Sequence, residues 1–398
     1  MIIVAEIIFW LSVGLVFHSY VLFPVLLKVF STGKKENAIV YGVRDEDLPM
    51  VYLVFSVFNE QKVIREKLES VMNTTYPFQK LRVYIGSDNS TDETNAIVDE
   101  FAAKYEQIRF FKFVVRNGKS GVINKLITEL GSTVLNPTKD ILIFTDANVM
   151  FTATTIFEMV KHFKQLQIGQ VAANILNRGV TAEGIAHQEK SYIQRENKMK
   201  YQEGLNWGSM MGAFGACYAM RADCWVEIPK NYLMEDFYLS MNVFKSKKKA
   251  ISELNAVCYE DVSTEVGEEF KRKSRIQAGN FQNLSVYWPL LFGFNAVSFC
   301  FLSHKVIRWF GPVFIVAAYI ANALLLKHGG FYIFTFVLQN LLLLSPVVDA
   351  ALKKMGIHLF VLRLASYFYT MNLALVNGFL MYTKGIKTST WSPTKRTV

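Results

Sequence analysis

Long apolar stretches flank a central region in which apolar and polar positions alternate at short intervals. Residues 2–27 are almost entirely apolar and are long enough to cross a bilayer, which takes about 20 residues. Residues 48–284 have the mixed pattern of a globular domain, and from about residue 285 the chain is apolar again. We expect two later stretches, 311–326 and 331–352, to span a membrane as well. The pattern therefore predicts one globular domain between membrane segments.

The basic residues near the first apolar stretch set its expected orientation. A signal peptide carries a basic residue before its apolar core and a small-residue cleavage site after it. Here Lys28, Lys34 and Lys35 all follow the apolar stretch. We therefore expect a retained anchor whose N-terminus lies outside, with the globular domain in the cytoplasm.

The remaining apolar segments are less uniform. Residues 357–382 include Arg363 and two asparagines, so we expect this segment to lie in the interface or to re-enter the membrane. A full crossing would place the basic tail, 383–398, outside, against the usual preference for basic residues on the cytoplasmic side. Residues 294–309 have the aromatic and basic edge of a helix that lies on the membrane surface.

The composition agrees with a membrane protein. The chain is 52% hydrophobic, and 43 lysines and arginines against 33 aspartates and glutamates give it a net charge of +10. Such an excess suits either nucleic acid or anionic lipid headgroups. In a chain with membrane segments we expect the lipid partner and no nucleic acid. The four cysteines lack metal-ligand spacing, so we expect them to be buried and reduced.

Strand-like and helix-like segments alternate in the first half of the globular domain. Apolar runs that end in polar residues predict strands, and segments with a period near 3.6 predict helices. This alternation predicts an α/β domain with a mostly parallel sheet. The strands are expected within 50–60, 81–94, 108–115 and 140–149, and the helices over 60–73, 93–105 and 116–130.

A polar cluster follows each of the four strands. The clusters are "NE" (59–60), "SDNSTD" (87–92), "RNGKS" (116–120) and "DAN" (146–148). Turn chemistry explains any one of them. The carboxyl ends of parallel strands, however, meet at one sheet edge, where ligands bind in such folds. Four clusters at that edge predict a binding site.

The residues in these clusters suit a nucleotide diphosphate. "RNGKS" combines a helix start with Arg116 and Lys119, which suits phosphate, although it lacks the spacing of a Walker A loop. Asp88 has acceptor oxygens for a base or ribose. Asp146 with Asn148 suits a hard divalent cation that bridges phosphates, or alternatively a turn or helix cap.

The series "FSVFNE", "IGSDNSTDET", "RNGKSGVINKL" and "FTDANV" resembles the donor half of family 2 glycosyltransferases, including the membrane members related to hyaluronan, chitin and cellulose synthases. The resemblance implies a GT-A, Rossmann-like fold, a nucleotide-sugar donor that is usually UDP-linked, and Mg²⁺ or Mn²⁺. It places "DAN" at the D-x-D position, with Asp146 as the expected metal ligand. Asn148 stands where many members carry a second Asp, and its neutral amide oxygen would bind a cation more weakly. The expected donor and nucleotide residues are Ser56, Glu60, Asp88, Lys119, Asp146, Arg272, Trp391 and Arg396.

The second half carries the residues expected to perform the reaction. Glu235 and Asp236 precede a helix-period run. They are favourable there as a capping pair alone, but the resemblance places "MED" at the family's catalytic acidic pair, with Asp236 as general base. The family's small-residue stretch on the acceptor side is similar to 212–221. It gives Gly212, Gly215 and Tyr218 as acceptor-side residues.

The C-terminal part matches the family less closely. In "EEFKRKSRIQAGNFQNL" the family's Q-x-x-R-W pattern becomes Arg272, Arg275 and Ile276. Arg275 is expected to stabilise the diphosphate leaving group. Loss of the Trp that stacks on acceptor sugar argues against processive synthesis. "TWSPTKR" (390–396) is similar to a gating segment, with a solvated tail as the alternative.

These features predict a multi-pass glycosyltransferase of the bacterial inner membrane that uses a lipid-linked or growing glycan acceptor. A processive synthase and a non-catalytic nucleotide-sugar sensor are the alternatives. The expected parts are a transmembrane helix (1–30), a cytoplasmic GT-A domain (48–284, with donor half 48–150 and acceptor half 151–284), interfacial helices (285–310), transmembrane or re-entrant helices (311–382) and a basic tail (383–398).

Overall fold

The computed structural model of the chain contains two compact units. The helical unit consists of Met1–Leu26 and Val266–Gly385, and the sheet unit consists of Leu27–Glu265 with Ile386–Val398. The residues that the structure describes are 1–131, 136–178, 185–261, 266–357 and 359–387.

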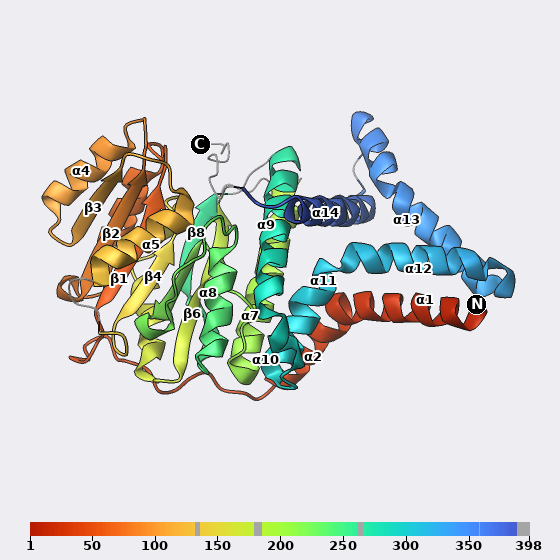
Figure 1. Cartoon of the computed structure of the whole chain (residues 1–398), viewed down its shortest axis with the longest axis horizontal. Coiled ribbons are helices and arrows are strands. Elements are labelled where there is room, and N and C mark those ends of the chain that lie inside the picture. Colours follow the sequence, from red (N-terminus) through yellow and green to blue (C-terminus); the bar gives the residue numbers. More distant parts are fainter. Residues whose placement is uncertain (132–135, 179–184, 262–265, 358, 388–398) are drawn as a thin grey trace. The chain divides into compact units, whose positions relative to one another are not determined.

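The described part of the sheet unit contains an eight-stranded mixed sheet in the order β3-β2-β1-β4-β7-β6-β8-β5 (Figure 1). The first four strands in this order are parallel to one another, as the sequence predicted. β7 is antiparallel to both β4 and β6, β6 is parallel to β8, and β5 is antiparallel to β8. The strands are β1 Val51–Val57, β2 Leu81–Asp88, β3 Ile108–Phe113, β4 Ile141–Thr145, β5 Val149–Phe151, β6 Ile168–Arg178, β7 Cys217–Arg221 and β8 Lys249–Asp261.

Helices cover both faces of this sheet, which is why the β1 sequence is apolar at almost every position. Leu53 and Phe55 pack in a cluster with α3 and α4, whereas Tyr52 and Val54 pack in a second cluster with α5 and α8. Alternate residues of a strand face opposite ways, so a strand buried on both faces needs apolar residues throughout. The helices of this unit are α3 Ile64–Met72, α4 Thr94–Lys104, α5 Gly118–Gly131, α6 Thr155–Val160, α7 Ile185–Trp207 and α8 Glu235–Lys245.

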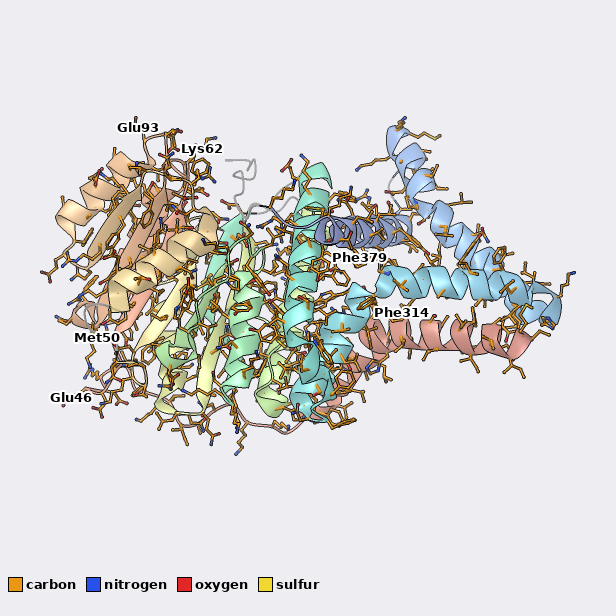
Figure 2. All side chains as sticks on the ribbon, viewed as in Figure 1. Glu46, Met50, Lys62, Glu93, Phe314 and Phe379 are labelled. Carbon is orange, nitrogen blue, oxygen red and sulfur yellow. The ribbon has the colours of Figure 1, made fainter. Side chains whose placement is uncertain are left out.

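The loops after β1 and β2 hold each other in place at the carboxyl edge of the sheet. Asn59 adopts a left-handed conformation, with φ of 52°, and its Oδ1 accepts a hydrogen bond from the Thr91 amide at 2.9 Å. The Gln61 amide donates to Asp92 at 3.2 Å. Figure 2 labels Lys62 and Glu93 in these two loops, and Met50 at the opposite end of β1.

Among the described residues, three helices are long and apolar enough to cross a membrane: Ile2–Ser31, Gly311–His328 and Gly330–Lys354. They overlap the three predicted spans. The segment predicted to be interfacial or re-entrant forms a continuous helix of 24 residues, α14, which is not among the three. The helices are α1 Ile2–Phe17, α2 Phe23–Ser31, α9 Val266–Tyr287, α10 Ala296–Cys300, α11 Ile307–Trp309, α12 Gly311–Leu325, α13 Gly330–Lys354 and α14 Phe360–Thr383.

Close backbone contact joins α9 to α14 inside the helical unit. A β-carbon at Gly378 would lie 2.4 Å from the Ser274 carbonyl oxygen, so only glycine permits this approach. The Phe281 ring meets the Phe379 ring edge-on at a centroid distance of 4.9 Å; Figure 2 labels Phe379 on α14. Residues 294–309, expected as one interfacial helix, form α10 and α11 with a π-helical turn between them.

Candidate active site

A single lysine connects the two predicted halves of the site. Lys119 Nζ lies 2.7 Å from Asp146 Oδ1 and 2.7 Å from Glu235 Oε1. Lys119 is in the first turn of α5, Asp146 follows β4, and Glu235 begins α8. Burial by itself would lower the pKa of Lys119, but the two carboxylates outweigh burial and raise it above its ordinary value. Lys119 is therefore a permanent cation between two acids.

Asp236 lies beside this triad and is almost fully buried, at 7% exposure. Its Oδ1 accepts a hydrogen bond of 2.7 Å from the Phe237 amide. Burial, followed by the negative charge of Glu235, raises the pKa of Asp236 to about 6, while Lys119 opposes the rise. A carboxylate with such a pKa is ionised at neutral pH yet accepts a proton more readily than an exposed aspartate.

The predicted acceptor-side glycines pack against the start of α8. A β-carbon at Gly215 would lie 2.9 Å from Asp236 Oδ2. Gly212 has φ of +77°, and a β-carbon there would lie 2.5 Å from the Phe237 ring. The Ala213 amide donates to Ser240 Oγ at 3.0 Å. These glycines are thus required by close packing around the acidic pair.

Two further residues of the 212–221 stretch, Tyr218 and Arg221, are buried in the protein. Tyr218 is 1% exposed and packs on Phe144, with a ring centroid distance of 5.3 Å. Tyr218 thus lies within the core, and its acceptor-side role stays a prediction. Arg221 lies opposite Ile141, at the other end of β7, and its guanidinium donates to the carbonyls of Ile168, Thr138, Phe163 and Gln165.

Asp88 organises the "RNGKS" loop. It accepts hydrogen bonds from Arg116 Nε at 3.0 Å and from the backbone amides of Asn117 and Gly118. The Arg116 guanidinium in turn lies 3.3 Å from the centroid of the Phe58 ring. The sequence suggested that the amides of this loop hold phosphate, but two of them are bonded to Asp88. Contact of Asp88 with a base stays a prediction.

The "DAN" loop offers one carboxylate for a metal. The Asp146 side chain is 35% exposed and its Oδ1 already pairs with Lys119. Asn148 Nδ2 lies 3.4 Å from Glu260 Oε1. Within the described ranges, no group of three His, Cys, Asp or Glu side chains is placed to hold a metal ion. Mg²⁺ and Mn²⁺ are often held by one or two carboxylates together with substrate phosphates. Asp146 fits a cation of that kind.

Ser56 and Glu60 are the remaining predicted donor residues of the described sheet unit. Ser56 is half-buried near the end of β1. Glu60 is buried, and its amide donates to Thr94 Oγ1 at 2.8 Å. Arg272 and Arg275 lie on α9 in the helical unit, and their roles stay predictions. Trp391 and Arg396 lie outside the described residues.

The sequence reasoning missed two buried lysines of the sheet unit. Lys200 on α7 is 3% exposed, and its Nζ lies 3.2 Å from the centroid of the Phe214 ring. Its positive charge opposes the rise in the pKa of Asp236. Lys67 on α3 is fully buried behind the "DAN" loop. Lysines on charge-rich helices usually face solvent, but Lys67 falls in the helical period of Ile64, Leu68 and Val71, and this spacing is the signal that could have indicated its burial.

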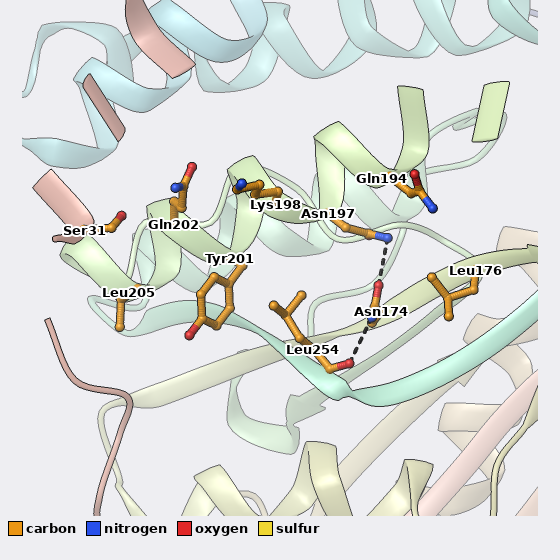
Figure 3. Close-up of a pocket in the computed structure, with 10 residues that line it drawn as sticks. All are labelled: Ser31, Asn174, Leu176, Gln194, Asn197, Lys198, Tyr201, Gln202, Leu205 and Leu254. Carbon is orange, nitrogen blue, oxygen red and sulfur yellow. Dashed lines mark hydrogen bonds between the residues drawn. The ribbon is translucent and has the colours of Figure 1, made fainter. Parts of the chain in front are cut away.

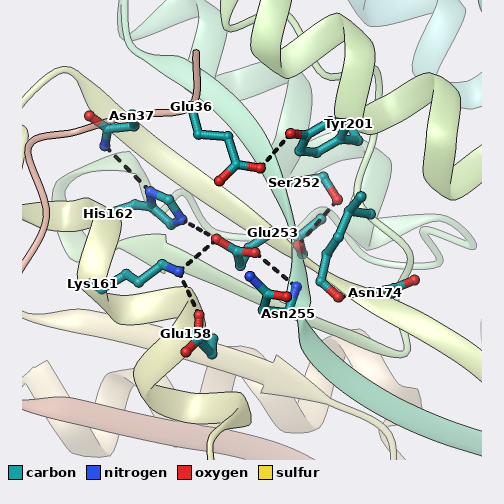
Figure 4. A network of polar contacts seen from close by, with 12 residues as sticks. Glu36, Asn37, Glu158, Lys161, His162, Asn174, Tyr201, Ser252, Glu253 and Asn255 are labelled. Atoms are coloured by element: carbon teal, nitrogen blue, oxygen red, sulfur yellow. Dashed lines mark hydrogen bonds and ion pairs between the residues drawn. The ribbon is translucent and has the colours of Figure 1, made fainter. Parts of the chain in front are cut away.

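A separate cavity of about 480 Å³ lies between α7 and the strands β6 and β8 (Figure 3). None of the predicted site residues that the structure describes lines it. Beside it, Glu253 accepts hydrogen bonds from His162 at 2.7 Å and from the Asn255 amide at 2.8 Å, and pairs with Lys161 at 2.9 Å (Figure 4). Burial favours the neutral acid, but these partners outweigh it and lower the pKa of Glu253 to about 2. This is a structural ion-pair network.

The comparison with known families agrees with this arrangement. Residues 52–225 match the family described as Glycosyl transferase family 2. The chain carries a family 2 glycosyltransferase domain. The matched range begins inside β1 and ends after β7, and it contains Lys119, Asp146 and the acceptor-side glycines.

Two curated relatives show which known proteins this chain is similar to. The probable glycosyltransferase YdaM of Bacillus subtilis (strain 168) is 34% identical over 96 residues, which are 23% of this chain and 22% of the relative. A β-monoglucosyldiacylglycerol synthase of Synechocystis sp. is 25% identical over 251 residues, 60% of this chain and 50% of the relative. The chain thus spans half or less of the length of these relatives.

A solved structure gives the fold. The mannosyltransferase PcManGT from Pyrobaculum calidifontis, in complex with GDP-Man and Mn²⁺, superposes with a TM-score of 0.68. It is 18% identical, and the match covers 94% of this chain and 99% of that one. The fold is therefore GT-A, as the sequence resemblance implied.

Proposed function

We propose that this chain is a membrane glycosyltransferase that moves a sugar from a nucleotide-sugar donor to a lipid-linked or growing glycan acceptor, with inversion at the anomeric carbon. The observation that carries the proposal is Lys119 bridging Asp146 and Glu235, with Asp236 beside them at a raised pKa. A lysine suited to a diphosphate and a carboxylate suited to its cation thus lie beside a second, buried carboxylate, Asp236, that is suited to act as a base.

The reaction is a single displacement. An acceptor hydroxyl oxygen forms a bond to the anomeric carbon while the bond from that carbon to the donor's phosphate oxygen breaks. The hydroxyl proton passes to the carboxylate of Asp236, which must be ionised to receive it. The donor leaves as a nucleoside diphosphate that carries the electron pair of the broken bond. Asp236 on the acceptor side therefore works on the face opposite the leaving group.

Stabilisation of the diphosphate is assigned to the other charged residues. Lys119 offers its ammonium to phosphate oxygens, because a diphosphate competes with Asp146 and Glu235 for the same cation. Arg275 is proposed for the same task. Mg²⁺ or Mn²⁺ at Asp146 would neutralise charge on the departing diphosphate; the Mn²⁺ in the mannosyltransferase complex supports this cofactor.

A lipid-linked acceptor agrees with two observations. The part of the chain that the structure describes has three helices long and apolar enough to span a membrane, and several of its curated relatives are named β-monoglucosyldiacylglycerol synthases. We place the protein in the inner membrane, with the GT-A domain in the cytoplasm. Ile276, at the position of the acceptor-stacking Trp, favours single addition over polymerisation.

The test is a donor screen with the full-length protein in lipid nanodiscs. UDP-glucose, UDP-galactose, UDP-GlcNAc and GDP-mannose are supplied with Mn²⁺ and either diacylglycerol or a polyprenyl phosphate. We expect one donor to release its nucleoside diphosphate faster when an acceptor lipid is present, and Asp236→Asn to remove the increase. If every donor binds but none turns over with either lipid, a nucleotide-sugar sensor becomes the better account.

A further inference from the structure

Lys67 forms hydrogen bonds with the residues at both ends of the "DAN" loop. It is fully buried on α3, and its Nζ donates to Thr145 Oγ1 at 3.0 Å and to the Val149 carbonyl oxygen at 2.5 Å. Thr145 is the last residue of β4 and Val149 is the first residue of β5. Residues 146–148 are the whole connection between them. One ammonium group therefore fixes the width of the loop that carries Asp146.

The surroundings of Lys67 are otherwise apolar. Its Nζ lies 3.7 Å from the centroid of the Phe151 ring and 5.8 Å from that of Phe55. None of the ion pairs found among the described residues includes it. Burial lowers the pKa of Lys67 to about 8, and the titratable groups that act against this decrease are Cys217, Cys258 and Asp146. A buried ammonium without a carboxylate partner costs folding free energy, so packing alone gives no reason for a lysine here.

The contacts of Lys67 extend toward the acidic pair. Thr145 Oγ1, which accepts from Lys67, donates to the Ala216 carbonyl oxygen at 2.8 Å. The Asp146 amide donates to the same oxygen at 3.1 Å. Ala216 follows Gly215, which lies against Asp236. Lys67 is thus linked by hydrogen bonds through Thr145 to Ala216, in the segment that lies against Asp236.

We propose that Lys67 is a positioning residue that holds loop 146–148 in the shape that presents Asp146 to the diphosphate and its cation. The proposal rests on the function proposed above. Lys67 touches neither ligand; it acts through Thr145 and Val149. Loss of the ammonium would leave the α3 packing intact but would free the loop to widen.

The experiment measures loop order without any ligand. Lys67→Met keeps the length of the side chain and removes the charge, and Lys62→Met removes an exposed lysine just before α3 as the matched control. Hydrogen–deuterium exchange is followed at the amides of Asp146 and Val149, whose hydrogen bonds close the loop. We expect Lys67→Met to exchange at least about tenfold faster there, with a Tm equal to or above that of the wild type, because a buried charge has been removed. Lys62→Met should change neither.

A second pair of variants tests the same contact from its other side. Thr145→Val removes the hydroxyl that accepts from Lys67, and Thr145→Ser retains it. The valine variant should exchange faster in the loop and the serine variant should not, which keeps the proposal testable if Lys67→Met does not fold. Unchanged exchange in Lys67→Met, or a lowered Tm with faster exchange throughout the sheet, would overturn the proposal.

Ligand binding separates this proposal from the proposed function. Binding of Mn²⁺ with pyrophosphate is measured by the loss of the free Mn²⁺ signal in electron paramagnetic resonance. We expect weaker binding in Lys67→Met and wild-type binding in Lys62→Met. If the wild type binds no Mn²⁺ with pyrophosphate although Lys67→Met loosens the loop, the donor-site assignment fails while the loop contact stands. If Lys67→Met loosens the loop and binds as tightly as the wild type, the positioning role is wrong.

Discussion

Gly215 lies directly against Asp236, because a β-carbon at position 215 would stand 2.9 Å from Asp236 Oδ2. Gly215→Ala should therefore displace the proposed base while leaving the donor side unchanged. We expect kcat to fall by about 10- to 100-fold, since misplacement by about 1 Å has effects of this size, with little change in donor KM. Gly131→Ala is the matched control, because a β-carbon there meets nothing within 4 Å. Equal activity in both variants would mean that Asp236 does not act from this position.

The pH dependence should report Asp236. Its pKa is raised to about 6, and a general base works only when ionised, so kcat/KM should rise with pH through about 6 and then level off. Glu235→Gln removes the negative charge that contributes to the raised pKa. The acid limb of the remaining activity should then move to lower pH. An acid limb that stays in place would assign it to another group.

Lys119→Met should move the same limb in the opposite direction. The Lys119 charge lowers the pKa of Asp236, and its loss also leaves Asp146 and Glu235 without the cation that they share. We expect the acid limb to shift to higher pH and the affinity for nucleoside diphosphate to fall, as measured by calorimetry. Lys125→Met changes an exposed lysine of the same helix that pairs with Asn117 and should leave the acid limb unchanged. Wild-type nucleotide affinity in Lys119→Met would remove this lysine from the donor site.

Transfer should also require a divalent cation at Asp146. Chelation with EDTA should stop turnover, Mn²⁺ or Mg²⁺ should restore it, and Asp146→Ala should not be restored by either. Asn148→Asp introduces the second carboxylate of a D-x-D motif, and we expect it to tighten Mn²⁺ binding in the presence of nucleotide. Full turnover in EDTA would return the "DAN" loop to a purely structural role.

The sequence predicted the donor half well because its signals are local. Each of the four expected strands exists, and the polar clusters follow their carboxyl ends. Buried strands require continuous apolar runs, and parallel strands require helices between them. A reader of the sequence can therefore place Asp88, Lys119 and Asp146 at one edge from periodicity alone.

The remaining features depend on contacts between distant segments. No local pattern indicates that β7 inserts antiparallel between β4 and β6, or that Lys119 reaches Glu235 as well as Asp146. The hydrogen bonds that Asp88 accepts from the loop after β3 also had no local signal, and its contact with a base stays a prediction. The spacing of Lys67 with Ile64, Leu68 and Val71 indicates the buried face of its helix, but its partners Thr145 and Val149 are about 80 residues away in the chain and no local pattern indicates them.

The most direct test of the account compares Asp236→Asn with the wild type in transfer and in binding. With the donor and lipid found in the screen, transfer of radiolabelled sugar should fall by about 10²–10⁴-fold in the variant, the usual effect of losing a general base. Nucleoside diphosphate affinity should stay within about twofold of the wild type, and Asp99→Asn, at an exposed position paired with Lys112, should behave as the wild type in both assays. Normal transfer by Asp236→Asn would contradict the account, because the acidic pair would then serve only to begin α8.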